Sequence, residues 1–303
     1  MSWRLLRSFI ALVPVLWLAV TVAFFLLRLL PGDAVDAQLA QGGASQERIA
    51  QVRQQMGLDD PIPTQYRRYL TSMLRGDLGY SFVNAQPVAE VIAARLIPTL
   101  VLAVSAIVLA LLLGVSMGII ASFENGLFAS FANLLTILSI STPIYWTGTL
   151  AILAFAVQLD WLPASGSGGW PHLVLPVAVL GFHTMGEIAR VVRVNLVETR
   201  SALFIRTAHS KGLRPRTILW RHMLRVVWIP VITVTALQAG FLFSGTVITE
   251  MLFVRPGIGT LLLDSTIDQD YPVVQGIVVL SALGYVVVNA SADTLHGLLD
   301  PRL

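Results

Sequence analysis

Cysteine is absent from this sequence, and charge is scarce. Without cysteine the chain can form no disulfide, no thiolate metal site and no cysteine nucleophile. Charged residues make up 12% of the 303 positions, whereas a soluble domain usually carries about 25%. Hydrophobic residues make up 55%, and the mean hydropathy is +0.76. This composition excludes an ordinary soluble domain and indicates an integral membrane protein.

Sequence motifs for bond chemistry are missing as well. Lys211 is the only lysine and follows Ser210 rather than a glycine, so the chain has no nucleotide-binding P-loop. No His-Glu-x-x-His sequence occurs, and the five histidines are too dispersed for one helix-borne metal site. Neither Ser165 nor Ser167 has a glycine two residues before it, so the nucleophile-elbow pattern fails. We therefore predict no catalytic residue, no metal site and no cofactor in this chain.

Long apolar runs take the place of these motifs. A bilayer-spanning helix needs about 20 mostly apolar residues. We predict an all-α polytopic membrane protein with six such helices, at residues 9–30, 99–122, 128–159, 172–194, 226–250 and 273–295. Pro143 interrupts the third helix. The first run is too long for a signal peptide and no small-residue cleavage site follows it, so we expect it to be retained. Gly114 and Gly118 have the spacing that permits close helix contact.

The polar stretch between the first two helices defines the predicted domain organisation. Residues 1–30 form the tail and first helix, residues 31–98 an external helical segment, and residues 99–303 a five-helix core that includes a loop at 195–225. That loop has seven basic residues, whereas the 160–171 loop has none. The positive-inside rule therefore predicts that both termini and the basic loop lie in the cytoplasm. Residues 31–98 then lie outside, which long loops reach largely regardless of their charge.

Within the basic loop, Phe204, Ala208 and Leu213 can line an apolar face. Gly212 can end a short helix and Pro215 can begin another, which predicts two short helices at a sharp angle along the membrane surface. A basic segment that binds anionic lipid would have the same composition. These residues alone leave both interpretations open.

The same loop carries a family resemblance. Residues 206–212 (Arg-Thr-Ala-His-Ser-Lys-Gly), followed by Arg221-His222 and Ile229-Pro230, resemble the cytoplasmic coupling motif of ABC importer permeases, in the form found in the dipeptide, oligopeptide and nickel branch. Further segments resemble that branch in the same order, at residues 56–63, 74–79, 95–99, 161–166, 253–259, 270–275 and 299–302. The resemblance covers nearly the whole chain. Val227-Trp228 and Val254-Arg255 depart from the usual residues.

This resemblance implies a permease subunit in a bacterial inner membrane, multi-pass, with both termini cytoplasmic. It implies four kinds of partner: a second homologous permease, two cytoplasmic ATPases that bind ATP and magnesium, a soluble periplasmic or lipid-anchored binding protein, and membrane lipid. No nucleic acid is implied, and the chain itself does no bond chemistry. A short peptide is the expected cargo, with nickel or another metal chelate, or glutathione, as the alternative.

The resemblance also implies which residues couple the permease to the ATPases. A coupling helix docks in an ATPase cleft, and Gly212 allows the turn after it. The implied coupling residues are Phe204, Ile205, Arg206, Thr207, Ala208, His209, Ser210, Lys211, Gly212 and Leu213.

Two sets of residues are candidates for the translocation path or its gate. His183, Glu187 and Arg190 are spaced to share one helix face at membrane depth, where ionisable residues normally face a bundle interior or a water-filled path. A self-satisfied Glu187–Arg190 pair with no cargo role is equally open. The second set follows helix 5 and suits an external gate or a binding-protein contact, although an ordinary surface loop is the alternative. It comprises Glu250, Phe253, Pro256, Gly257 and Gly259.

Other classes of protein make different predictions. An enzyme acting within the membrane would have to use His183 and Glu187, and the purified subunit would turn over substrate alone. A channel or passive carrier would show flux without ATPases.

Overall fold

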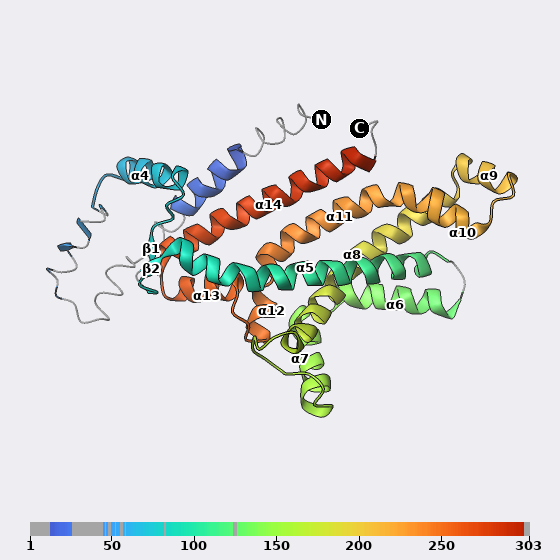
Figure 1. Ribbon diagram of the computed structural model, residues 1–303, viewed down its shortest axis with the longest axis horizontal. Helices are drawn as coiled ribbons and strands as arrows, with labels where there is room; N and C mark the ends of the chain where they lie inside the picture. Colours follow the sequence, from blue (N-terminus) through green and yellow to red (C-terminus); the bar gives the residue numbers. More distant parts are fainter. Residues whose placement is uncertain are drawn as a thin grey trace. The chain divides into compact units, whose positions relative to one another are not determined.

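The computed structural model describes residues 13–25, 45, 47, 50, 51, 53, 54, 57, 59–81, 83–123 and 126–299. Helices dominate this part of the chain, and one two-stranded hairpin interrupts them (Figure 1). An apolar helix at Val13–Phe25 comes first. The labelled elements are α4 (Ile62–Leu74), β1 (Tyr80–Ser81), β2 (Gln86–Pro87), α5 (Val88–Ala121), α6 (Leu127–Ser141), α7 (Ile144–Ala151), the π-helix η1 (Ile152–Gln158), α8 (Pro171–Arg200), α9 (Leu203–Ser210), α10 (Pro215–Thr217), the π-helix η2 (Ile218–Met223), α11 (Leu224–Gly245), α12 (Val247–Leu252), α13 (Ile258–Ile267) and α14 (Tyr271–Leu299).

Four helices of the described chain are long and apolar enough to cross a membrane, at Val88–Ala121, Pro171–Arg200, Pro215–Leu242 and Tyr271–Leu295. A fifth span exists if the pair Leu127–Ser141 and Ile144–Gln158, bent by 112°, counts as one. This confirms the predicted class, a helical polytopic membrane protein, and the predicted interruption at Pro143. Of the first predicted helix, residues 9–12 and 26–30 lie outside the described residues.

The structure corrects several predicted boundaries. The second predicted helix begins at Val88 instead of residue 99 and runs through Pro98, because membrane helices tolerate proline where neighbours satisfy the freed backbone groups. Pro215 begins a long continuous helix, so the prediction of a second short surface helix is wrong. In the first turn of a helix the backbone N–H groups make no intrahelical hydrogen bond, so a proline there costs none. The helix can therefore continue directly from Pro215 into η2 and α11. The predicted 251–272 loop contains the helix α13.

The chain divides into two compact units, residues 1–99 with 256–286 and residues 100–255 with 287–303. In the first unit α4 packs on helix Val13–Phe25: the hydroxyls of Thr21 and Tyr66 lie 2.6 Å apart, and the buried Phe24 ring lies 5.1 Å from that of Tyr66. A second apolar cluster joins α5, α13 and α14 through Val88, Val91, Ile92, Ile258, Leu261, Val273 and Ile277.

In the second unit α8 packs against α6, α7 and α11 (Figure 1). Small residues let the helices approach closely. A Cβ added at Gly118 of α5 would lie 2.6 Å from the Cβ of Val192, and one added at Gly114 would lie 2.8 Å from that of Ile188. The predicted close helix contact at these two glycines is therefore confirmed. α8 supplies the buried side chains on the other side of both contacts.

Candidate functional sites: coupling loop, central helix and outer turn

The basic loop at 195–225 contains a short helix, α9, which ends in a hydrogen-bonded Schellman turn. Gly212 has φ +71°, a left-handed conformation that glycine adopts without strain. Its N–H donates to the carbonyl of His209 at 2.9 Å, and the N–H of Leu213 donates to that of Ala208 at 3.3 Å. These two bonds satisfy carbonyls that the end of a helix leaves unpaired. The structure thus bears out the prediction that Gly212 ends this helix.

Two opposite faces of α9 have different surroundings. Ile205 is 1% exposed and Ala208 is 5% exposed, and both belong to one apolar cluster with Ile218, Met223 and Leu224. Phe204, by contrast, is 46% exposed. Phe204 and Ala208 therefore lie on different sides of α9, so the prediction of one apolar face shared by Phe204, Ala208 and Leu213 is wrong. Ala208 and, partly, Leu213 pack into the protein's own core because η2 lies under α9.

The outward side of α9 is basic and partly apolar. Leu203 is 78% exposed. The remaining outward residues are exposed as well: Arg206, Thr207, His209, Ser210, Lys211 and Gly212.

A neighbouring contact joins the end of α8 to the α5–α6 turn, where the guanidinium carbon of Arg200 lies 5.8 Å from the ring centroid of Phe123.

His183 on α8 lies against the break between α6 and α7. Its Nε2 lies 2.6 Å from the Thr147 hydroxyl oxygen of α7, and its ring also hydrogen-bonds the backbone of Ser139 on α6. Pro143 has no N–H, so it cannot donate to the carbonyl four residues earlier, which is that of Ser139. The imidazole therefore contacts both halves of the broken helix.

Glu187 and Arg190 form an ion pair at 2.6 Å on the same helix. Their side chains are 29% and 60% exposed, so the pair has the geometry of the self-satisfied alternative while remaining accessible. The strip of α8 formed by His183, Glu187 and Arg190 thus makes polar contacts along its length. Sequence spacing correctly places all three on one face of a helix.

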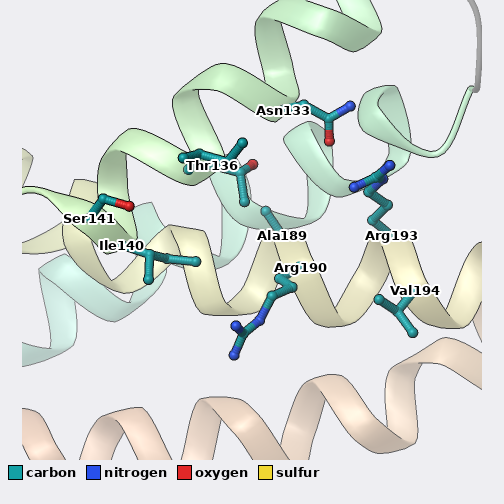
Figure 2. A pocket seen from close by; sticks show the side chains of 9 residues that line it. Asn133, Thr136, Ile140, Ser141, Ala189, Arg190, Arg193 and Val194 are labelled. Carbon is teal, nitrogen blue, oxygen red and sulfur yellow. The ribbon is translucent and has the colours of Figure 1, made fainter.

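A cavity of about 520 Å³ lies next to this strip, between α6 and α8 (Figure 2). Arg190 contributes to its wall, and so does Arg193, one turn further along α8. Its walls consist of Asn133, Thr136, Ile137, Ile140 and Ser141 from α6 and of Ala189, Arg190, Arg193 and Val194 from α8. The sequence alone had not indicated this cavity, because α6 carries no charged residue that would mark it.

The gate candidates between residues 250 and 259 divide between the two compact units. Glu250 and Phe253 lie in the second unit and are each 1% exposed. Pro256, Gly257 and Gly259 lie in the first unit. There the N–H of Ile258, between the two glycines, donates to the Thr99 hydroxyl oxygen at 2.8 Å, and both glycines are buried. These glycines therefore support the packing of α13 onto α5.

Arg255 is a residue of this turn that sequence reasoning noted only as a departure from the family pattern. It is 7% exposed, and its Nη1 donates to the carbonyl of His172 at 3.0 Å and to that of Gly166 at 3.4 Å. Burial lowers the pKa of Arg255, and the charge of Glu250 opposes that shift. The N–H of Gly166 donates to the carbonyl of Phe253 at 2.9 Å. The 160–171 loop and the turn after α12 are thus joined.

A buried polar contact in the first unit was also missed. The Ser81 hydroxyl donates to a carboxylate oxygen of Asp270, and the backbone N–H of Asn84 donates to the Ser81 hydroxyl oxygen at 3.0 Å. Ser81 and Asp270 are 0% and 3% exposed. Burial raises the pKa of Asp270, while hydrogen bonds from Ser81, the backbone of Val273 and Asn84 oppose the shift. The contact joins the hairpin to the start of α14.

Comparison with known proteins finds relatives along the whole chain. A family described as "Binding-protein-dependent transport system inner membrane component" matches residues 110–303, and its N-terminal counterpart matches residues 1–103. The "Glutathione transport system permease protein GsiC" of Salmonella paratyphi A is 38% identical over 300 residues, covering 98% of this chain and 97% of the relative. The GsiC proteins of Salmonella typhimurium LT2 and Escherichia coli K12 are 38% and 35% identical over the same shares.

Proposed function

This chain belongs to the family of binding-protein-dependent transport system inner membrane components, the permease subunits of ABC importers, and we propose that it carries short peptides across the bacterial inner membrane. Glutathione is the first cargo to test, since it is a tripeptide and is named for relatives that match 98% of this chain. Nickel or another metal chelate is the alternative cargo.

The proposed assembly contains a second homologous permease, two cytoplasmic ATPases and a periplasmic or lipid-anchored binding protein. ATP and magnesium belong to the ATPases, because the chain has no P-loop. The proposed topology has six spans, cytoplasmic termini, an external segment at 31–98 and a cytoplasmic loop at 195–225, with the permease core at 99–303. The four or five candidate spans of the described chain support it. Helix Val13–Phe25 would belong to a further span.

The observation that carries this proposal is the two-sided burial of α9. Ile205 and Ala208 attach the helix to the core that also contains α8 and α11. The opposite side exposes Leu203 and Phe204 beside basic residues. An exposed apolar patch rimmed by polar residues is typical of a protein interface. A partner that moves α9 would therefore move the membrane helices with it.

The test replaces an exposed apolar residue of α9 with a charged one. Phe204→Asp should remove the ATPases from the purified complex, because the new carboxylate would be buried without a partner in the docking cleft. ATP-dependent glutathione or tripeptide uptake into proteoliposomes, in the presence of the binding protein, should be abolished. The thermal stability of the isolated subunit should stay close to that of the wild type, since Phe204 is outside the core.

Arg214→Ala is the matched control, since Arg214 is exposed one residue beyond the Schellman turn. It should retain both the ATPases and uptake. If Phe204→Asp also retained both, α9 would not be the coupling element, and the basic loop would be better explained as a lipid-binding segment.

We propose the polar strip of α8 as part of the cargo path and the turn after α12 as part of its external gate. His183, Glu187 and Arg190 support the first idea, since a polar strip on a membrane helix avoids lipid. The alternative of an intramembrane enzyme is disfavoured, because His183 contacts Thr147 and Glu187 pairs with Arg190. Uptake by the subunit without ATPases would contradict the importer proposal and favour a passive carrier.

A further inference from the structure

The two arginines that line the cavity between α6 and α8 differ in how their charges are paired. Glu187 pairs with Arg190 at 2.6 Å. No acidic side chain within the described ranges pairs with Arg193, although both arginines line the same cavity. In Figure 2 the Arg193 side chain extends toward the end of the cavity where Asn133 lies, and Arg190 extends away from it. Among the described residues, therefore, no anion balances the positive charge at this end of the cavity.

The walls of the cavity are mostly apolar. Ile137, Ile140, Ala189 and Val194 form much of the lining. Among the polar members, the Thr136 hydroxyl already donates to the carbonyl of Ala132 at 2.8 Å. Such walls suit a hydrocarbon chain, whose removal from water is favourable.

The depth of the cavity along α8 matches a membrane boundary. At ~1.5 Å per residue, Arg190 and Arg193 lie about 28 Å and about 33 Å from the first residue of the helix, Pro171. The hydrocarbon core of a bilayer is about 30 Å thick. In a helix that crosses the membrane, Arg193 would thus lie at the level of the phosphates of one leaflet, and the apolar walls would lie beside acyl chains.

We propose that this cavity binds an anionic phospholipid, with its phosphate on Arg193 and Asn133 and part of an acyl chain against Ile137 and Ile140. A guanidinium presents paired N–H donors that match a phosphate. Basic pockets between membrane helices on the cytoplasmic side are known to hold anionic head groups. The proposal requires α8 to cross the membrane and is independent of which cargo the importer carries.

Native mass spectrometry of the assembled, delipidated importer with added phosphatidylglycerol or phosphatidylcholine tests this site. The wild type should retain phosphatidylglycerol in preference to phosphatidylcholine. Arg193→Gln should weaken that retention about fivefold, the effect of one basic residue near an anionic surface. Val194→Trp, which fills the cavity without changing its charge, should also weaken it. Arg216→Gln, at an exposed arginine in α10, is the control of equal charge and should have no effect.

Three results would overturn the site. The two lipids could be retained equally, or Arg193→Gln could leave the preference intact, or Arg216→Gln could weaken retention as much as Arg193→Gln does. A fourth contrary result would be an Arg193→Gln variant that retains lipid as the wild type does but binds glutathione more weakly. The cavity would then belong to the cargo path.

Discussion

The Nε2 atom of His183 lies 2.6 Å from the hydroxyl oxygen of Thr147, so a side chain of α8 holds the first turns of α7 beside the break at Pro143. The same ring reaches the backbone of Ser139 in α6. Because α6 and α7 meet at an angle of 112°, a residue that contacts both sides of the break stabilises one particular bend.

His183→Leu should destabilise the protein by about 1 kcal/mol, the usual net contribution of one hydrogen bond, because the half-buried Thr147 hydroxyl keeps its bond to the carbonyl of Ile144. Thr147→Val should have a smaller effect. In the double variant the two effects should be less than additive, because they remove the same contact. Thermal unfolding of the four proteins in detergent measures this. Strict additivity would mean that the contact contributes nothing to holding the bend.

The contact between α5 and α8 can be tested with one methyl group. Gly118→Ala should cost about 1–3 kcal/mol, the range for overpacking a filled core, since its Cβ would lie 2.6 Å from that of Val192. Gly297→Ala is the matched control, because nothing lies within 4 Å of its added Cβ. Alanine favours helix over glycine by up to about 1 kcal/mol, so this control should be neutral or stabilising. Equal thermal shifts in the two variants would argue against the close contact.

The effect of a substitution at Gly212 should depend only on how readily the new residue adopts the left-handed backbone conformation. Nothing lies within 4 Å of its added Cβ, so steric clash plays no part, while φ +71° costs an ordinary residue about 1–2 kcal/mol. We expect ATPase retention and peptide uptake to fall in the order Gly212→Asn, Gly212→Ala, Gly212→Val. Asparagine adopts this conformation most readily, and a β-branched residue does so least. An asparagine variant as defective as the valine variant would refute this explanation.

The buried carboxyl of Asp270 makes stability depend on pH. Burial raises its pKa above the ordinary value of 3.8, so the folded protein holds the proton more tightly than the unfolded chain does. This contribution to stability is therefore present at low pH and is lost as the pH rises through the folded pKa. Asp270→Asn carries no such proton. The thermal stability of the variant relative to wild type should increase as the pH rises above the ordinary carboxyl pKa of 3.8. A constant difference would contradict the assignment.

Absence of cysteine allows a direct test of topology, since each introduced cysteine is the only one. Ser167→Cys should react with an impermeant thiol reagent from outside intact cells. Arg216→Cys should react only after the cells are opened. Both positions are exposed in the structure, so a failure to label would not arise from burial within the subunit. Labelling of Arg216→Cys in intact cells would reverse the proposed orientation.

Features set by neighbouring residues were predictable from the sequence. The break at Pro143, the helix end at Gly212 and the close contact at Gly114 and Gly118 each depend on one residue type with an unusual backbone or no side chain. Local pattern failed at Ala208, because an apolar helix face does not reveal whether it packs on its own chain or on a partner. Here it packs on η2.

Contacts between distant residues were not predictable in the same way. Ser81 and Asp270 are 189 positions apart, and Arg255 and Gly166 are 89 apart. Each pair forms only because the path of the chain brings two turns together, and no spacing rule connects them. The cavity between α6 and α8 has the same origin, since its two walls come from helices separated by the whole of α7 and η1.

Burial of Ile205 and Ala208 has a mechanical consequence. A helix held to its support by two side chains in a shared core cannot pivot independently, so a force on its outer face becomes a torque on the element beneath it. That element is continuous from Pro215 to Gly245, a rod about 45 Å long at ~1.5 Å per residue. Rotating such a rod by a few degrees at one end displaces the other end by several ångströms. The rigidity of the attachment of α9 to the helix beneath it, more than the side chains on its outer face, would then determine how far the membrane helices move for each ATPase stroke.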